Sequence, residues 1–387
     1  MGGLAERLAD GLAALDRDNL RRHRRVLDSP QGARATIDGR EVLNFSSNDY
    51  LGLANHPVLR EAAHAAIDAY GVGAGASALV SGHLRVHHDA ELRFARFTGL
   101  PRALLFASGY AANLGVLAAL ADRHAEIFAD RLNHACLNDG ALLSRAAFTR
   151  YPHLDLEALG MRLAASSAAV RVVATDTVFS MDGDLAPVAE LLALCERHDA
   201  YLLLDDAHGV GVLGGYGRGA LEHFAVASPR IVYMATLGKA LGGYGAFVGG
   251  APDVIEWLTQ RARTYVFSTA LPPVAPAVAT AAMDLVERDP SIVGRLHARI
   301  AQFRAAASGL GLRLAPSGSA IHPLMLGDAA RALDVAARLM DRGYFVPAIR
   351  PPTVPEGTSR LRVSLSAAHS PEDVAGLVAA LAQSVAS

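Results

Sequence analysis

The feature that most constrains this 387-residue chain is an alternation of short apolar runs with helical patterns between about residues 57 and 285. Helical periodicity separates most of the apolar runs, as in Ala111–Leu120 and Pro187–Arg197. Strands that alternate with helices are typical of a mostly parallel sheet with helices on both faces. The strands that we predict are Ala103–Phe106, Glu126–Ala129, Val170–Thr175, Tyr201–Leu204, Ile231–Met234 and Ala246–Gly249.

Different patterns flank this α/β region. Residues 4–27 have the periodicity of an amphipathic helix with an arginine-rich end, and Asp38-Gly39 predicts the turn of a short hairpin. After Asp289-Pro290 we predict helices at 291–309, 329–342 and 371–384, and strands near Leu312–Leu314, Pro323–Leu326, Phe345–Ile349 and Arg360–Leu365. We therefore expect an N-terminal helix and hairpin arm at 1–45, a large α/β domain at 46–285 and a smaller C-terminal α+β domain at 286–387.

Composition excludes several classes of protein. The formal net charge is −2 and charged residues make up 19% of the chain, which argues against nucleic acid as a partner. Cys136 and Cys195 are far apart and lack metal-ligand spacing, which favours reduced thiols. No run approaches the roughly 20 apolar residues of a membrane span, and the first residues lack a signal-peptide pattern. We expect a cytoplasmic protein without membrane contact.

One lysine stands out against a background of arginine. Lysine and arginine together number 36, and Lys239 is the single lysine. Arginine replaces lysine as a surface cation, but its guanidinium stays protonated and cannot act as an amine nucleophile. Lys239 follows the predicted strand Ile231–Met234 in a glycine-rich loop, where open α/β sheets bind their ligands. A surface lysine without function is the alternative, and the context favours amine chemistry.

Two further motifs follow predicted strands. Asp205 begins the sequence Asp-Asp-Ala-His after the apolar run Tyr201–Leu204, and a carboxylate there requires a positive partner. That partner could be a protonated pyridine nitrogen or a metal ion, but no third ligand cluster accompanies Asp205 and His208, so we expect no metal site. Ser108, Gly109 and Tyr110 open a predicted helix, and helix N-termini bind phosphate well.

These parts together match the requirements of pyridoxal 5′-phosphate (PLP). A lysine amine can form a Schiff base with the aldehyde, an aspartate can keep the pyridine protonated, and a helix N-terminus can hold the phosphate. His134 and Ser180 follow predicted strands on loops expected at the same end of the sheet. A lone histidine is more often structural than catalytic, and an ordinary turn is the alternative for Ser180. The glycines of Gly71–Ala76 resemble a dinucleotide fingerprint, but they follow the helical pattern Glu61–Tyr70 and not a strand, which argues against an oxidoreductase.

Over nearly its whole length the chain resembles the α-oxoamine synthases, a family of fold-type I PLP-dependent enzymes. The motifs that carry this resemblance are Leu43–Gly52 (LNFSSNDYLG), Val178–Asp184 (VFSMDGD), Asp205–Gly209 (DDAHG) and Ile349–Thr358 (IRPPTVPEGT). The last of these favours the branch that condenses a pimeloyl thioester. The resemblance implies decarboxylative condensation of L-alanine with pimeloyl-CoA or a pimeloyl-acyl carrier protein, in biotin biosynthesis, by a homodimer.

The resemblance also implies roles for individual residues. Lys239 would form the Schiff base with PLP and move protons at the substrate Cα, and Asp205 would pair with the pyridine nitrogen. His134 would stack on the ring, and Ser180 and His208 would contact its phenolic oxygen. The phosphate ligands would be Ser108, Gly109, Tyr110 and Thr236. The substrate ligands would be Asn48, His134 and Arg362 for the amino acid and Arg21 and Thr353 for the acyl chain, with Arg22 as an alternative to Arg21.

Alternatives remain at this point. Related α-oxoamine synthases condense glycine with acetyl-CoA, glycine with succinyl-CoA, or serine with a long-chain acyl thioester. The family also contains non-catalytic regulatory subunits, which are expected to lack the lysine that is present here. The sequence does not distinguish CoA from acyl carrier protein as the acyl donor.

Overall fold

The computed structural model describes residues 3–386, which form two compact units. Unit 1 contains the described residues up to Asn48, Met181–Gly183 and the described residues from Ala298 onward, and unit 2 contains Asp49–Ser180 and Asp184–His297. The expected domain boundaries at residues 45 and 285 stay predictions. None of the described helices combines the length and the apolar character needed to cross a membrane.

Unit 2 is built around a seven-stranded sheet with the order β3-β9-β8-β7-β6-β4-β5. Its strands are β3 (Arg102–Phe106), β4 (Ala125–Asp130), β5 (Ala147–Tyr151), β6 (Val170–Asp176), β7 (Tyr201–Asp205), β8 (Ile231–Thr236) and β9 (Ala246–Gly250). Only β9 runs against its neighbours, since β4 to β8 pair in parallel and β3 pairs antiparallel with β9. The predicted mostly parallel sheet is therefore confirmed, and so are all six predicted strands.

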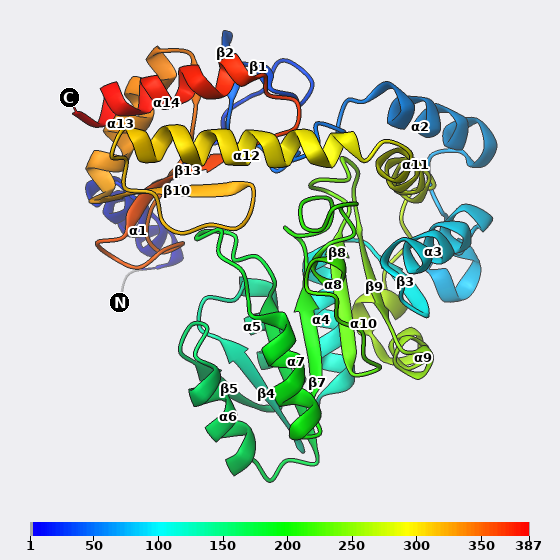
Figure 1. Cartoon of the computed structure of the whole chain (residues 1–387). Helices are drawn as coiled ribbons and strands as arrows, with labels where there is room; N and C mark the ends of the chain where they lie inside the picture. Colours follow the sequence, from blue (N-terminus) through cyan, green and yellow to red (C-terminus); the bar gives the residue numbers. More distant parts are fainter. Residues whose placement is uncertain (1–2, 387) are drawn as a thin grey trace. The chain divides into compact units, whose positions relative to one another are not determined.

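Helices cover both faces of this sheet, with α7 in front of it and α4 behind it in Figure 1. The helical elements of unit 2 are α2 (Pro57–Tyr70), η1 (Ala78–Gly82), α3 (Arg85–Thr98), α4 (Gly109–Leu120), α5 (Ala135–Ser144), α6 (Leu156–Ala165), α7 (Val188–Arg197), α8 (Ala220–His223), α9 (Pro252–Arg261), α10 (Arg263–Val266) and α11 (Val274–Arg288). The central strands are apolar and buried because both of their faces are covered. Val116 and Leu117 of α4 pack against Val232 of β8 and Val248 of β9 in the main core.

Strand β5 is the element of the sheet that the sequence did not predict. It lies at the edge, beside β4 alone, and its residues are mostly half-buried or exposed. Its composition (AFTRY) therefore lacks the apolar run that marks the central strands.

Unit 1 contains two small three-stranded sheets with the orders β1-β2-β11 and β10-β13-β12. Its elements are α1 (Leu4–Arg17), β1 (Arg34–Ile37), β2 (Arg40–Asn44), β10 (Ile321–Gly327), α13 (Ala329–Asp341), β11 (Tyr344–Phe345), β12 (Ala348–Ile349), β13 (Ser359–Ser364) and α14 (Pro371–Ala386). Helix α12 (Ser291–Gly309) begins in unit 2 and ends in unit 1. The hairpin at Asp38-Gly39 and the three C-terminal helices agree with the prediction.

Three expectations for unit 1 were wrong. The N-terminal helix ends at Arg17 and not at residue 27, because Asn19 adopts a left-handed backbone (φ 55°) that a helix cannot continue. The Leu312–Leu314 segment forms only an isolated bridge from Leu314 to Leu324. The segment Phe345–Ile349 is split into β11 and β12 around Pro347, which has no backbone N–H to donate to a sheet.

Candidate active site

The predicted motifs of unit 2 gather at one edge of the sheet. Strands β3, β4, β6, β7 and β8 run in the same direction, so the residues that follow them meet at the carboxyl edge. This is where open α/β sheets bind ligands. The motifs at this edge come from segments up to about 130 residues apart: Ser108–Tyr110, Asn133-His134, Asp205–His208 and Thr236–Lys239.

Lys239 lies in a tight loop between β8 and β9. The loop is closed by hydrogen bonds from Leu237 N to Gly245 O (2.9 Å) and from Gly243 N to Leu237 O (2.8 Å). Gly242 has a left-handed backbone (φ 67°), and a Cβ there would lie 2.6 Å from the carbonyl carbon of Leu53. Only glycine readily adopts this backbone conformation and also allows the close approach of Leu53. Gly242 therefore fixes the loop in the conformation that positions Lys239.

The Lys239 amine contacts an imidazole. Lys239 Nζ lies 2.8 Å from His208 Nε2, and His208 Nδ1 lies 2.7 Å from the Tyr50 hydroxyl. If Nζ donates to Nε2, the imidazole is neutral and its Nδ1–H donates to the Tyr50 oxygen. Tyr50 belongs to a motif that carried the family resemblance, but its contact with His208 was not predicted. This chain of three groups can accept a proton from, or return one to, the lysine amine.

Asp205 ends strand β7 as a buried carboxylate with neutral partners. Its Oδ2 accepts a hydrogen bond from Asn113 Nδ2 (2.7 Å), and its Oδ1 accepts one from Ala207 N (3.0 Å). Between residues 3 and 386, no cationic side chain forms an ion pair with Asp205. Asn113 is a site residue that the sequence analysis missed, and its position one helical turn after Ser108-Gly109 was the available signal.

Hydrogen bonds of its backbone and side chain fix the position of His134 at the start of α5. It caps the N-terminus of α5, and its N–H donates to Asp176 Oδ2 at 2.6 Å. The His134 residue is exposed overall, yet desolvation of its ring lowers its pKa and favours the neutral imidazole. Burial, followed by the charge of Asp205, raises the pKa of Asp176 well above its usual range.

The N-terminus of α4 forms the candidate phosphate site. Ser108 caps the helix by accepting a hydrogen bond from Ala111 N (3.1 Å), which leaves the first helical N–H groups without an intrahelical partner. A Cβ at Gly109 would lie 3.8 Å from Thr236 Cβ, so the predicted residues from β8 and α4 adjoin. The Tyr110 hydroxyl donates to Asp139, and this hydrogen bond raises the pKa of Tyr110.

Ser180 lies in a turn after β6. This turn is closed by an isolated bridge between Val178 and Leu185 and by a hydrogen bond from Phe179 N to Asp184 O (3.1 Å). The predicted contact of Ser180 with the cofactor stays a prediction.

The predicted substrate residues of unit 1 form two groups. Arg362 is buried on β13, and its Nη1 donates to Asn48 Oδ1 (3.2 Å) and to Ser364 Oγ (2.9 Å). The two residues predicted to bind the amino acid carboxylate are thus in contact. Such an arginine and amide pair offers several N–H donors to a carboxylate.

The second group distinguishes the two adjacent arginines. Arg22 Nη2 donates to Thr353 Oγ1 (2.7 Å), whereas Arg21 Nη1 pairs with Asp16 Oδ2 (2.6 Å). Neither arginine is helical, because α1 ends at Arg17. The structure therefore places Arg22, and not Arg21, beside the predicted acyl-chain residue Thr353.

The chemistry of these groups fits PLP. The fit rests on a buried carboxylate without a cationic partner, an amine at the same sheet edge, and a helix N-terminus beside a threonine. Asp205 suits the pyridine nitrogen, Lys239 the aldehyde, and Gly109 with Thr236 the phosphate. When bound, PLP supplies an aldehyde that captures amines and an electron-withdrawing ring.

Comparison with known proteins identifies the family. The sequence model of "Aminotransferase class I and II" matches residues 40–381. The 8-amino-7-oxononanoate synthase of Methylococcus capsulatus is 53% identical over 378 residues, covering 97% of this chain and 98% of the relative.

Solved structures agree with this assignment. A structure of SPT with a PLP internal aldimine superposes with a TM-score of 0.94 at 28% identity, covering 99% of this chain and 98% of the other. The 8-amino-7-oxononanoate synthase of Francisella tularensis superposes with a TM-score of 0.77 at 30% identity, covering 89% and 98%. The chain therefore belongs to the class I and II aminotransferase family of PLP-dependent enzymes, and within it to the 8-amino-7-oxononanoate synthases.

Proposed function

We propose that this chain condenses L-alanine with a pimeloyl thioester, giving 8-amino-7-oxononanoate, carbon dioxide and the free thiol, as a step of biotin biosynthesis. A bond forms between the alanine Cα and the thioester carbonyl carbon as the C–S bond breaks. The Cα–carboxylate bond then breaks and a proton takes its place. The observation that carries the proposal is the 2.8 Å contact of Lys239 Nζ with His208 Nε2 at the sheet edge that also holds Asp205.

Lys239 and His208 would move the protons of this reaction. Lys239 Nζ removes the Cα proton of alanine and later returns one to the same carbon. His208 Nε2 accepts a hydrogen bond from Nζ and so orients the amine. Because His208 is itself fixed by Tyr50, the amine is held where a proton transfer requires it.

The remaining residues would bind and orient. Asp205 compensates the positive pyridine nitrogen, His134 stacks on the ring as a neutral imidazole, and Ser180 donates to the phenolic oxygen. The N–H groups of Gly109 and Tyr110 and the Ser108 and Thr236 hydroxyls bind the phosphate.

The substrate itself would be held by a second group of residues. Arg362 and Asn48 bind the alanine carboxylate, which must be fixed during proton removal and then lost. Arg22 and Thr353 contact the acyl chain. We further propose that the enzyme is a cytoplasmic homodimer that takes its acyl group from CoA or from acyl carrier protein.

A product assay by mass spectrometry tests the function. The holoenzyme receives alanine, glycine and serine together with pimeloyl-, acetyl-, succinyl- and palmitoyl-CoA, and in a second reaction pimeloyl-acyl carrier protein. Dominant 8-amino-7-oxononanoate supports the proposal. Dominant product from serine and palmitoyl-CoA would instead favour the activity of serine palmitoyltransferase, a neighbour in fold.

Substitution of the lysine separates chemistry from binding. Lys239→Arg keeps the positive charge but removes the amine nucleophile, so we expect turnover to fall below detection while the melting temperature stays close to that of the parent. Appreciable turnover by this variant would contradict the assigned role of Lys239.

A further inference from the structure

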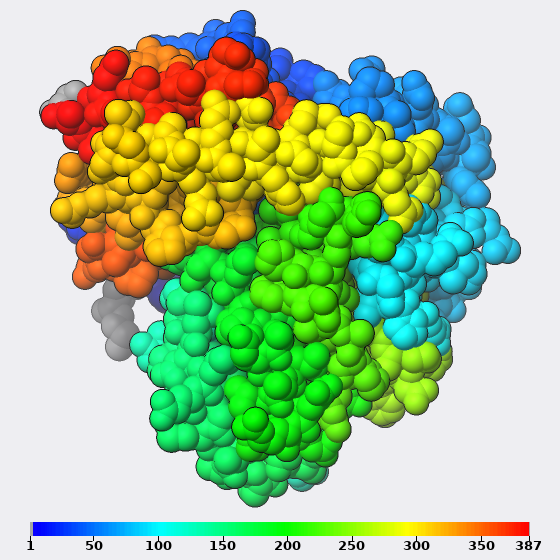
Figure 2. All heavy atoms as spheres, in the orientation of Figure 1, coloured from blue at the N-terminus to red at the C-terminus, as the bar shows by residue number. Residues whose placement is uncertain are grey.

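A cluster of metal-binding side chains lies outside the active site, at the start of helix α3. His83 precedes the helix, whereas His88 and Glu91 lie one turn apart on it and share a face. One ligand atom from each of these residues lies within 4.8 Å of the other two. In Figure 2 the cyan atoms around α3 lie at the surface of the molecule.

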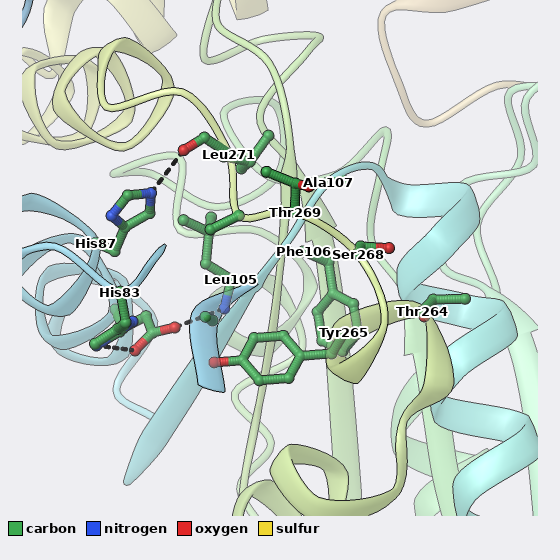
Figure 3. Close-up of a pocket in the computed structure, with 13 residues that line it drawn as sticks. His83, His87, Leu105, Phe106, Ala107, Thr264, Tyr265, Ser268, Thr269 and Leu271 are labelled. Carbon is green, nitrogen blue, oxygen red and sulfur yellow. Dashed lines mark hydrogen bonds and ion pairs between the residues drawn. The ribbon is translucent and has the colours of Figure 1, made fainter. Parts of the chain in front are cut away.

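The carboxylate of this cluster is already oriented. Glu91 Oε1 accepts a hydrogen bond from Leu105 N of β3 (2.9 Å), which leaves Oε2 directed to His83 Nε2 at 3.9 Å (Figure 3). Outer hydrogen bonds of this kind fix the direction of metal ligands. The carboxylate is mostly buried, with 13% of its side chain exposed, so its position is determined by the protein more than by solvent.

The neighbouring histidine is not available as a ligand. His87 Nε2 contacts Leu271 O at 2.8 Å (Figure 3). His87 Nδ1 accepts a hydrogen bond from Leu84 N (3.2 Å), so both ring nitrogens are occupied. The cluster therefore offers two imidazoles and one carboxylate, with a remaining position open to water. It lies in the wall of a pocket of ≈ 290 Å³, through which an ion can enter.

We propose that His83, His88 and Glu91 bind a divalent transition-metal ion of the zinc class. Two imidazoles and a carboxylate suit Zn²⁺, whereas Mg²⁺ and Ca²⁺ prefer oxygen ligands. Tetrahedral ligands at zinc distances lie about 3.3 Å apart, so each pair of ligand atoms must approach by no more than about 1.5 Å. The ion would fasten the segment before α3 to the helix, and through Glu91 to β3.

Equilibrium dialysis of the tag-free holoenzyme against Zn²⁺, with metal analysis, tests the proposal. We expect one zinc per chain at saturation, and at least about tenfold weaker binding in His88→Ala and in Glu91→Gln. Glu91→Gln keeps an oxygen that can accept from Leu105 N, so it removes the ligand charge with little effect on folding. His64→Ala, at an exposed histidine of α2, is the matched control and should bind zinc like the parent.

Two outcomes would overturn this site. The first is no zinc bound by the parent above the level of a His83→Ala/His88→Ala double variant. The second is zinc binding that His88→Ala and Glu91→Gln leave unchanged. Retention of PLP absorbance by each variant shows that it is folded, and zinc-dependent melting temperatures provide a second readout that does not depend on activity.

Discussion

Two consecutive aspartates at the end of β7 have opposite surroundings. Asp205 contacts an asparagine amide and a backbone N–H, and it faces the edge where Lys239 lies. Asp206 is fully buried and accepts hydrogen bonds from the hydroxyls of Thr177 and Tyr233 and from Ala220 N (2.9 Å). A Cβ at Gly209 or at Gly219 would overlap its carboxylate. Asp206 is therefore enclosed by the protein, whereas Asp205 lies at the sheet edge where we propose that the cofactor binds.

This difference teaches that burial of a carboxylate does not by itself mark a functional site. Burial raises the pKa of Asp206 to about 6, but its oxygens are matched by protein donors and there is no room for a ligand. Asp205 is nearly as buried, but it ends β7 at the sheet edge that also holds Lys239, and its carboxylate accepts hydrogen bonds from Asn113 and from Ala207 N. Both aspartates lack a cationic partner within residues 3–386, so what distinguishes Asp205 is its place among groups that suit a cofactor.

Neutralising Asp205 is the strongest test of the difference between the two aspartates. Asp205→Asn preserves shape but cannot compensate a protonated pyridine, so we expect kcat to fall by at least about a thousandfold while the melting temperature changes little. Steady-state kinetics with saturating PLP and alanine check this. A loss of less than tenfold would mean that Asp205 does not face the cofactor nitrogen.

Asn113 allows a second test, because its side chain positions the carboxylate of Asp205. Asn113→Ala removes the 2.7 Å hydrogen bond to Asp205, and hydrogen bonds to charged groups contribute about 1.5–3 kcal/mol. We expect PLP to bind about ten- to a hundredfold more weakly, with an altered pH profile of kcat. The matched control is Asn138→Ala on α5, because Asn138 Oδ1 is also buried without a hydrogen-bond partner but Asn138 donates only to Asn133 O. Equal effects in the two variants would contradict a role specific to Asp205.

Asp206 should show the reverse behaviour. In Asp206→Asn an amide NH₂ faces the hydroxyls of Thr177 and Tyr233 or Ala220 N, so at least one donor loses its acceptor. We expect a loss of about 1–3 kcal/mol in the free energy of unfolding at neutral pH and a change in kcat of less than about fivefold. Chemical denaturation and kinetics on the same preparation test both parts. A large fall in kcat without a loss of stability would refute the distinction between the two aspartates.

The sequence predicted the scaffold better than the partners within the site. Apolar runs and helical periodicity located the central strands, because strands covered on both faces must be apolar. They could not locate β5, whose edge position permits polar residues, or the end of α1, which depends on the backbone of Asn19. The lysine, the aspartate and the helix N-terminus that follow predicted strands predicted the cofactor, because each PLP group needs a particular chemistry.

The residues that were missed are those whose partners lie far away in sequence. Asn113 meets Asp205 across 92 residues, and the choice of Arg22 over Arg21, which the sequence left open, depends on a contact with Thr353 across 331 residues. No local periodicity encodes such contacts. The candidate metal site at α3 was not predicted for a similar reason. His88 and Glu91 have a recognisable helical spacing, but His83 joins them from a non-helical segment.

Asp130 is a third buried carboxylate, and its positive partner, His153, belongs to the protein itself. His153 Nδ1 lies 2.9 Å from Asp130 Oδ1, and His153 Nε2 lies 2.8 Å from Asp184 Oδ2. Both ring nitrogens face carboxylates, so both must carry protons. Burial alone would lower the pKa of His153, but the hydrogen bonds and charges of the two aspartates raise it to about 10.

The smallest expected effect is the pH dependence that follows from this raised pKa. The histidine binds its proton more tightly in the folded state, so its stabilisation is fully present below the unfolded value of 6.5 and is lost as pH rises through about 10. His153→Gln should therefore lower the free energy of unfolding by about 2 kcal/mol at pH 6, and this deficit should shrink steadily toward pH 10. Urea denaturation at several pH values measures it, with His124→Gln, at an exposed surface histidine, as control. A deficit that stays constant with pH would show that His153 is held neutral, and the contrast with Asp205 would then rest on packing and not on charge.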